Sequence, residues 1–346
     1  MTNKPSKFAL LLDRYHPVLR AAFLDAIADI RSQVILRLLV ERLERSDVQG
    51  ALDVLNIERA AFGGLEIAIA EVYNAGGIGM AEEMRLHDPE GNRVVFRFGV
   101  RNPEAEAWLR EHSSRLVTRI VEDQRVGIQL ALSEGLMQGQ NPRTTALDVV
   151  GRINRITGRR EGGLIGLTAQ QEQFVATARQ QLLSGDPAQL RAYLTRERRD
   201  KRFDRAVAKA IREGKPLDRE TVNRIVGRYA DRLLALRGEM LARSETLTAL
   251  NGARNQAMRQ AIAEGKVRAE FVFKTWRATH DGRTRFTHRV LDRQRVQMDE
   301  AFVSPSGARL MFPGDPAAPA HEHVGCRCTM EMTIDFSRQL LARRAA

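Results

Sequence analysis

The sequence changes character near residue 266, and this change limits the folds that are open to it. Before that point, apolar residues recur at three- and four-residue spacing over long stretches, as at Phe23, Ile27 and Ile30, which is typical of amphipathic helices. After it, short alternating stretches such as Glu270 to Trp276 are separated by turns rich in Gly and Pro. We therefore expect a mainly α protein with a small C-terminal α+β or β-rich domain, with long helices in the body and short hairpins after about residue 266.

Local signals place the expected elements. One long helix is predicted from His16 to Arg45, and Asp47 is placed to cap the helix that follows. A strand is predicted near 93–99, bounded by Gly91–Asn92. Helical spacing covers further segments: 60–73, ending in the glycine-rich 74–79; a segment opened by Pro103; a segment opened by Asn141–Pro142; 164–183; 187–211; and 218–264. In the tail, we expect a hairpin over 303–312 that turns at 304–307, and an extended segment over 324–334.

A length of 346 residues suggests two or three domains. We expect an N-terminal, mostly helical domain over residues 1–100 that includes the short strand, a basic helical body over 101–265, and a β-rich tail domain over 266–346. No run approaches the roughly 18 apolar residues of a membrane span, and the short apolar run near the start does not resemble a signal peptide. Two cysteines exclude a disulfide scaffold, so we expect the chain to fold in a reducing cytoplasm.

The basic charge is concentrated in the second part of the chain. Residues 1–138 hold 17 basic and 20 acidic side chains, residues 139–215 hold 16 and 8, and residues 216–346 hold 22 and 15. Of the 55 basic residues, 48 are Arg, whose planar guanidinium suits phosphate and carboxylate partners. A GC-rich genome would produce the same Arg excess. The asymmetry predicts that one part of the protein meets a polyanion and another part meets protein.

One group of basic residues has the spacing of a helical stripe. Its members step by seven, four, three, four and three: Arg191, Arg198, Arg202, Arg205, Lys209 and Arg212. We predict that this stripe contacts the phosphates of double-stranded DNA without sequence preference; the alternative is a solvated helix face with internal ion pairs. No zinc finger or glycine-rich phosphate loop accompanies it, so sequence-specific DNA recognition is not supported.

The tail concentrates His and Cys residues, which raises two chemical alternatives. Zinc could be bound by four side chains: His321, His323, Cys326 and Cys328. Cys-x-Cys is not a usual zinc spacing, so we expect instead two reduced, packed thiols, no metal and no cofactor. A nuclease or toxin-like enzyme could use His280, Asp281 and His288 around a divalent metal, but no recognisable metal-nuclease pattern accompanies them, so we expect no catalytic residues.

An ordered series of short motifs in the tail resembles the Mu F-like domain of tailed-phage head-morphogenesis (minor capsid) proteins. The matching positions are Lys274, Trp276, Asp281, Arg283, Arg285, His288, Leu291, Asp292, Asp299, Glu300, Phe302, the run Pro313-Gly314-Asp315-Pro316 and the run Cys326-Arg327-Cys328. Upstream, Ala242 to Thr246 and Ala249-x-Asn251-Gly252 resemble the helix that precedes this domain. The resemblance covers roughly 240–332. Two positions depart from the family pattern, since Arg293 stands where Gly is usual and Gly325 where Asn is frequent.

The resemblance implies a non-enzymatic minor capsid protein that acts at or near the portal vertex, inside the head, during capsid assembly and DNA packaging. Its implied partners are the portal and other capsid proteins and packaged double-stranded DNA, with no membrane, and the portal vertex would set its oligomeric state. The implied location is the virion interior, after assembly in the host cytoplasm. The motif residues then have a structural role, in which the charged members Asp281, Arg283, Arg285, Asp292, Asp299 and Glu300 form one polar network that holds a small sheet together. The two alternative functions are the nuclease or toxin-like enzyme described above and a host nucleoid-type DNA-binding protein.

Overall fold

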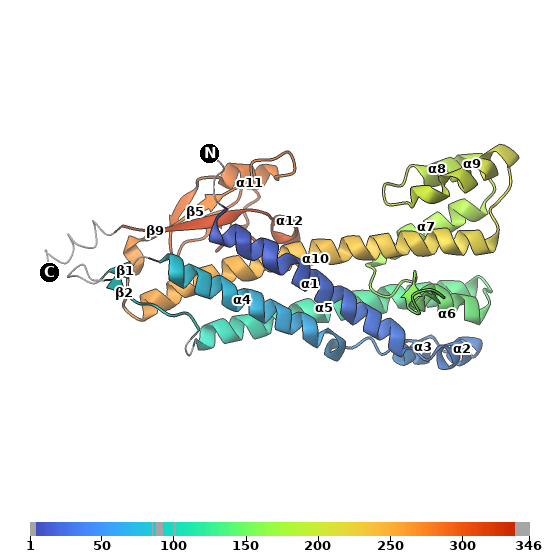
Figure 1. Ribbon diagram of the computed structural model, residues 1–346, viewed down its shortest axis with the longest axis horizontal. Coiled ribbons are helices and arrows are strands. Elements are labelled where there is room, and N and C mark those ends of the chain that lie inside the picture. Colours follow the sequence, from blue (N-terminus) through green and yellow to red (C-terminus); the bar gives the residue numbers. More distant parts are fainter. Residues whose placement is uncertain (1–4, 85, 88–92, 100–101, 336–346) are drawn as a thin grey trace. The chain divides into compact units, whose positions relative to one another are not determined.

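The computed structural model describes residues 5–84, 86–87, 93–99 and 102–335 (Figure 1). It is 64% helical, with long helices and a small C-terminal region of short antiparallel strands. The expected fold class, mainly α with a small β-containing tail, is therefore confirmed. In the described part of the chain, no helix is long and apolar enough to span a membrane.

The chain forms two compact units, and each draws on several separate stretches of sequence. Unit 1 consists of residues 1–20, 65–115 and 240–346, and unit 2 of residues 21–64 and 116–239. This division differs from the three consecutive segments expected from the sequence. The tail after residue 266 is part of unit 1, in which it shares a core with segments from earlier in the chain.

Unit 2 is built almost entirely of helices. Its elements are the second part of α1 (Lys7–Gln33), α2 (Leu36–Glu44), α3 (Val48–Leu55), η1 (Arg59–Phe62), the second part of α5 (Pro103–Met137), α6 (Pro142–Val150), β3 (Arg152–Ile153), β4 (Arg160–Glu161), α7 (Ala169–Leu183), α8 (Pro187–Leu194), η2 (Lys201–Phe203), α9 (Asp204–Glu213) and the first part of α10 (Arg219–Ala263).

Unit 1 combines helices with all of the tail. Its elements are the first parts of α1 and α5, nearly all of α4 (Gly63–Glu83), β1 (Leu86–His87), β2 (Arg93–Val94), the second part of α10, η3 (Ala269–Phe271), β5 (Val272–Arg277), α11 (Phe286–Leu291), β6 (Arg295–Gln297), β7 (Phe302–Val303), β8 (Arg309–Leu310), α12 (Ala320–His323) and β9 (Thr329–Ile334).

Several helix boundaries follow the local signals. Asp47 caps α3 by accepting a hydrogen bond from the Gly50 N–H, Asn141 caps α6, and Pro103 is the first residue of α5. The single helix predicted from His16 to Arg45 is wrong, because the chain forms α1 and α2 with a break between them. The break falls at Val34–Ile35, where two β-branched residues meet and Ile35 has extended backbone.

The prediction that the glycine-rich segment 74–79 ends its helix is wrong. Helix α4 runs through this segment and continues to Glu83. Its glycines allow close packing within unit 1. A Cβ on Gly76 would lie 3.1 Å from the Cα of Leu250, and one on Gly77 would lie 2.0 Å from the Phe98 ring. Burial of this face therefore outweighs the low helix propensity of glycine.

The strand predicted near 93–99 is reduced to β2, which pairs antiparallel with β1. The alternation of side chains persists beyond the strand, since Phe96 and Phe98 are buried while Val95 is exposed. Phe98 packs against Tyr73, with ring centroids 6.1 Å apart. The alternation over 93–99 thus correctly indicates which side chains are buried. No neighbouring strand among the described residues pairs with the segment after β2.

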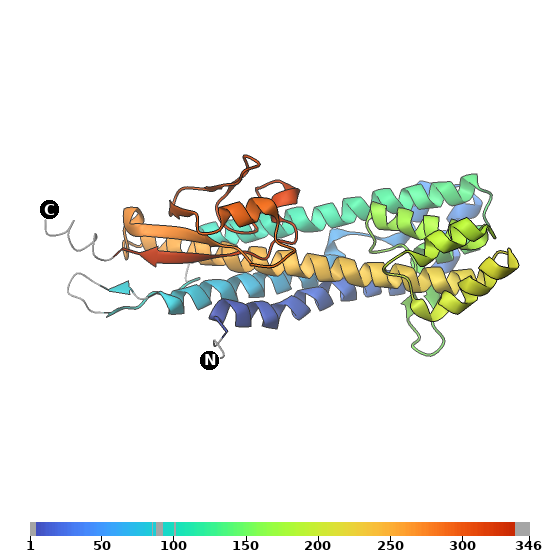
Figure 2. The ribbon, with the colours of Figure 1, turned by 90° about the horizontal axis from the view of Figure 1, so that it is seen from above.

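The tail contains a three-stranded antiparallel sheet with the order β6-β5-β9. Strand β5 confirms the strand predicted over 270–276 from Val272 onward, since the residues just before it form η3. The hairpin of β7 and β8 confirms the turn predicted at 304–307. The segment 324–334 is extended only in part, because β9 begins at Thr329 and is preceded by the short helix α12. The sheet lies beside the second part of α10 in both views (Figures 1 and 2).

Polar side chains of α10 hold the tail through its backbone carbonyls. Thr248 Oγ1 donates to the Gly314 carbonyl at 2.8 Å, and Asn251 Nδ2 donates to the carbonyls of Pro313 and Cys328 at 2.9 and 3.3 Å. Both side chains are buried. The turn at 313–316 and the part of α10 around Asn251 therefore depend on each other, because each provides hydrogen-bond partners for polar groups that the other buries.

Arg293 is one of the few described residues other than glycine with a positive φ, at 65°. We expect Arg293→Gly to raise the free energy of unfolding by about 0.5–1 kcal/mol, because a side chain in the left-handed region costs more than the added freedom of glycine in the unfolded chain. The Arg293 side chain is 80% exposed, so little contact is lost. Urea denaturation would measure the gain.

Arg295→Gly is the matched control for this prediction. Arg295 lies in β6, and its guanidinium lies 3.9 Å from the centroid of the Phe273 ring. Glycine there should destabilise the protein. Equal losses at both positions would contradict the interpretation of Arg293.

Candidate functional site

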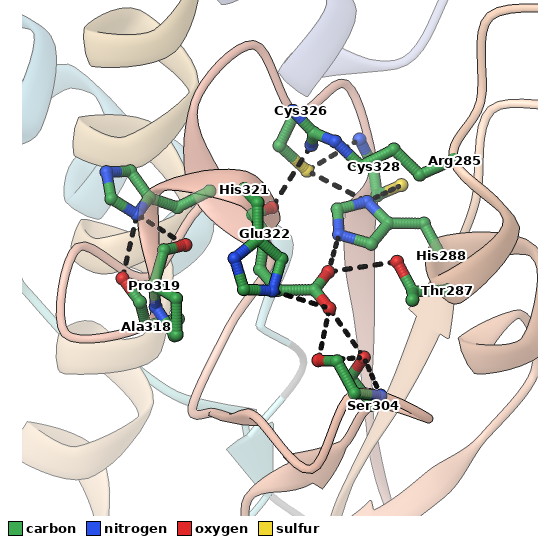
Figure 3. Close-up of polar contacts among 12 residues, drawn as sticks. Arg285, Thr287, His288, Ser304, Ala318, Pro319, His321, Glu322, Cys326 and Cys328 are labelled. Atoms are coloured by element: carbon green, nitrogen blue, oxygen red, sulfur yellow. Dashed lines mark hydrogen bonds and ion pairs between the residues drawn. The ribbon is translucent and has the colours of Figure 1, made fainter.

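A buried histidine lies at the centre of the tail (Figure 3). Helix α11 brings His288 under the sheet, where its ring packs edge-on against the buried Trp276 with centroids 5.2 Å apart. Trp276 makes the same kind of contact with Phe302 on β7. His288 is only 2% exposed. A polar ring enclosed in this way requires partners for both of its nitrogens.

The first partner is the carboxylate of Glu322 on α12. His288 Nε2 lies 3.0 Å from Glu322 Oε2. The same carboxylate accepts hydrogen bonds from three hydroxyl groups, those of Thr287, Ser304 and Ser306, at 3.0, 2.7 and 2.6 Å. Burial raises the pKa of Glu322, but these bonds and His288 outweigh it and hold the pKa below its usual value. Glu322 is therefore a fully buried carboxylate whose charge is compensated by its neighbours.

The second partner is the pair of cysteines. Cys326 Sγ and Cys328 Sγ lie 3.6 and 3.5 Å from His288 Nδ1, and both cysteines are buried and free. The contact with Cys326 lowers the pKa of Cys328 to about 5, against the opposing effect of burial and with help from His288. The same contact, together with burial, raises the pKa of Cys326.

Two arginines brace the segment that carries the cysteines. Arg327 donates to both carboxylate oxygens of Asp281, with the Nη2 to Oδ1 distance at 2.6 Å, and this pair holds the pKa of Asp281 well below its usual range. Asp281 also accepts from the Arg283 N–H. Arg285 donates to the backbone carbonyls of Glu322 and Val324. The loop before β9 is therefore fixed by charged groups at its surface and by the His288 cluster inside.

The remaining motif residues have separate structural contacts. Leu291 is in the core, Asp292 accepts from the Ala278 N–H at 2.9 Å, and Asp315 closes its own turn by accepting from Met311 and Ala317. The expectation of one shared polar network is wrong. Asp299 pairs with Arg259, Glu300 accepts from the Gln297 N–H, and the Arg283 side chain is exposed.

The structure does not assemble either chemical cluster as first grouped from the sequence. His321 is 66% exposed, and His323 Nδ1 lies 2.9 Å from the Ala318 carbonyl, so α12 directs neither ring to the cysteines. His280 is 74% exposed and lies 3.3 Å from Asp292, whereas His288 is buried and Asp281 is held by Arg327. Among the described residues, the group whose ligand atoms converge is His288, Cys326 and Cys328.

The six basic residues predicted to contact DNA are all exposed but do not share one helix. Arg191 lies on α8, Arg198 in the connection, Arg202 on η2, and the other three on α9. The long helix predicted over 187–211 breaks because the buried Asp200 caps η2 and binds the Arg202 side chain at 2.6 Å. Of the six, Arg202 pairs with Asp200 and Lys209 pairs with Glu213. The remaining four make no ion pair with described residues: Arg191, Arg198, Arg205 and Arg212.

Sequence reasoning missed the hydroxyl and carboxylate shell of His288. Glu322 stands between two histidines in a polar stretch, and nothing in that stretch indicates burial. Thr287, Ser304 and Ser306 have the composition of an ordinary turn or helix end. The one sequence feature that linked His288 to the cysteines was their membership of the same ordered series of motifs.

The tail is thus a small antiparallel sheet beside the long helix α10, with the buried His288 in its interior. Residues 201–331 match the family described as Phage Mu protein F like protein. This match confirms the resemblance found in the sequence. The match begins upstream of the tail, at η2, and ends within β9.

The chain is also similar to the minor head protein GP7 of Bacillus phage SPP1. The two are 36% identical over 101 residues, which are 28% of this chain and 31% of that relative. The similarity thus spans less than a third of the relative's length. No solved structure matches the chain.

Proposed function

We propose that this protein is a phage minor head protein that acts at or near the portal vertex, inside the head, during capsid assembly and DNA packaging. The match of residues 201–331 to the Phage Mu F-like family is the observation that carries the proposal. The similarity to a protein named as a minor head protein of a Bacillus phage supports it. In this proposal the portal and other capsid proteins are the partners, the portal vertex sets the copy number, and assembly takes place in the host cytoplasm.

The role that we propose is structural rather than enzymatic. Several polar residues of the family motif have structural partners, as Arg327 has in Asp281 and His288 has in the buried Glu322. His280, Asp281 and His288, which a nuclease would need around one metal, have three different environments. These contacts favour a domain in which the motif holds a fold together.

Mass spectrometry of purified, DNA-filled heads of the phage that encodes this chain tests the proposal. We expect the protein in the heads at a copy number far below that of the major capsid protein, and cross-links between it and the portal. Particles without the protein, formed in normal yield when its gene is disrupted, would contradict a role in head assembly.

We further propose that the basic hairpin of α8 and α9 contacts packaged DNA. Residues 187–215 contain ten basic and four acidic side chains. On α9, Arg205, Lys209 and Arg212 are spaced to lie on one face, and all three are exposed. Such a surface suits the phosphates of duplex DNA without reading its sequence.

Replacing Arg191, Arg198, Arg205 and Arg212 together by Gln should flatten the salt dependence of duplex DNA binding. The slope of log K against log salt should fall by up to about four, roughly one for each lost phosphate contact. Fluorescence anisotropy at several salt concentrations measures this slope.

A matched variant removes the same charge elsewhere, by replacing the exposed Arg37, Arg45, Arg110 and Arg119 by Gln. It should leave the slope unchanged. Equal slopes in both variants would mean that only net charge matters and would remove the hairpin as the DNA contact.

A further inference from the structure

We propose that His288, Cys326 and Cys328 bind a single Zn²⁺ ion inside the tail. Their ligand atoms, one imidazole nitrogen and two sulfurs, all lie within 4.8 Å of one another, and all three residues are buried. They come from two separate places in the chain, α11 and the segment just before β9. The site therefore differs from the grouping of the cysteines with His321 and His323 that the sequence suggested.

The distances fit a tetrahedral zinc ion. Zn–S bonds of about 2.3 Å and Zn–N bonds of about 2.0–2.1 Å at a tetrahedral angle place the sulfur and nitrogen about 3.6 Å apart. The distances from His288 Nδ1 to Cys328 Sγ and Cys326 Sγ are 3.5 and 3.6 Å. Both nitrogen-to-sulfur separations therefore have the spacing that a tetrahedral zinc ion requires.

Hydrogen bonding alone does not use this geometry well. The Glu322 carboxylate can only accept, so the proton of His288 resides on Nε2 and Nδ1 presents a single lone pair. Both sulfurs converge on that one lone pair, and at most one S–H can be directed at it. A cation bound to Nδ1 and to both sulfurs would use all three groups at once.

The surroundings of His288 are those of a metal-binding histidine. A carboxylate on the far nitrogen fixes the tautomer, orients the ring and raises its basicity as a ligand. Here Glu322 does this, and it is in turn oriented by Thr287, Ser304 and Ser306 (Figure 3). The orientation of the His288 ring is therefore fixed by a set of hydrogen bonds, as expected for a metal ligand.

The ligand chemistry selects the metal. Thiolates favour soft or borderline cations, and two thiolates with one neutral imidazole neutralise a divalent ion. No fourth His, Cys, Asp or Glu joins this cluster among the described residues, so a water molecule would complete the tetrahedron. The ion would join α11 to the segment just before β9, 38 residues along the chain at Cys326, which gives a thin-cored sheet an additional cross-link.

The test uses the full chain, purified with a reductant, stripped with a chelator and titrated with Zn²⁺ against a chromophoric competitor. We expect one Zn²⁺ per chain, and loss of that site in the Cys326→Ser/Cys328→Ser double variant. His321→Ala and His323→Ala should retain it, since both side chains point elsewhere. Limited proteolysis should show that residues 266–335 resist cleavage better with the metal than without it.

Stripped wild-type protein that takes up no stoichiometric Zn²⁺ would overturn the proposal, and so would equal uptake by the double variant. Circular dichroism establishes whether the double variant folds. If it does not fold, Co²⁺ in the wild-type protein decides: thiolate-to-cobalt charge-transfer bands support the site, and their absence refutes it.

Discussion

Glu322→Ala should lower the free energy of unfolding of the tail by about 3–5 kcal/mol, the cost of removing one partner from a buried charged network. Glu322 is fully buried and satisfies Thr287, Ser304 and Ser306 as well as His288. Without it, three hydroxyl donors and a ring N–H lose their acceptor in a closed space. Hydrogen exchange of residues 266–335, alongside urea denaturation, would measure the loss.

Two further variants at this place separate charge from shape. Glu322→Gln should cost less than alanine, because the hydroxyls of Ser304 and Ser306 can turn to accept from the new amide. His321→Ala, one residue away on the exposed side of α12, should change stability by less than about 0.5 kcal/mol. An alanine variant at 322 that is as stable as the parent would show that the hydroxyls do not depend on the carboxylate.

Glu172→Gln should raise the stability of unit 2 by about 2–4 kcal/mol at pH 7. Burial beneath α5, together with the nearby Asp123, raises the pKa of Glu172 to about 8, although Arg237 opposes this. Gly127 makes room for the carboxyl group, since a Cβ there would lie 2.6 Å from both of its oxygens. One of those oxygens, Oε1, has no hydrogen-bond partner among the described residues. Glutamine has nearly the same shape as glutamate and is neutral in both states. The free energy that keeping the carboxyl group protonated costs the folded protein at pH 7 is therefore not required.

The same shift sets the pH dependence of stability. The folded protein holds the Glu172 proton up to about pH 8, whereas the unfolded chain, in which the pKa is 4.5, loses it earlier. The folded state therefore binds more protons than the unfolded chain between these two pH values. The contribution of Glu172 is therefore full below about pH 4.5 and is lost as the pH rises through 8. Urea denaturation from pH 5 to 8.5 should show this loss in the parent and not in Glu172→Gln.

The exposed Glu122 on α5 offers a matched control. Glu122→Gln removes the same charge from the same unit and should leave the pH dependence of the parent intact. A parent protein whose stability does not fall between pH 5 and 8.5 would mean that Glu172 is ionised in the folded state.

Much of the architecture could be predicted from local sequence. The caps at Asp47 and Asn141, the helix start at Pro103 and the strand over 270–276 all depend on residues close together in the chain. The ordered tail motif pointed to the family whose model matches residues 201–331, because the spacing of its residues is a property of the sequence alone.

Where a local pattern failed, contacts distant in sequence were stronger than local preference. The glycines of 74–79 stay helical because they pack closely against Leu250 and Phe98. The helix predicted over 187–211 breaks where a buried Asp200 binds Arg202, and Arg232 from α10 joins it at 3.3 Å. Propensities differ by a fraction of a kcal/mol per residue, and such packing and charge interactions exceed them.

The candidate site shows the same division most clearly. The sequence by itself determined that Cys326 and Cys328 share one short segment and that His288 belongs to the same motif series. Only the tertiary structure decided that His288, rather than His321 or His323, meets the two sulfurs, and that Glu322 is the buried carboxylate behind it. The reason is physical: a polar residue carries no local sign of burial, and its partners are set by which distant elements the sheet and α10 bring together.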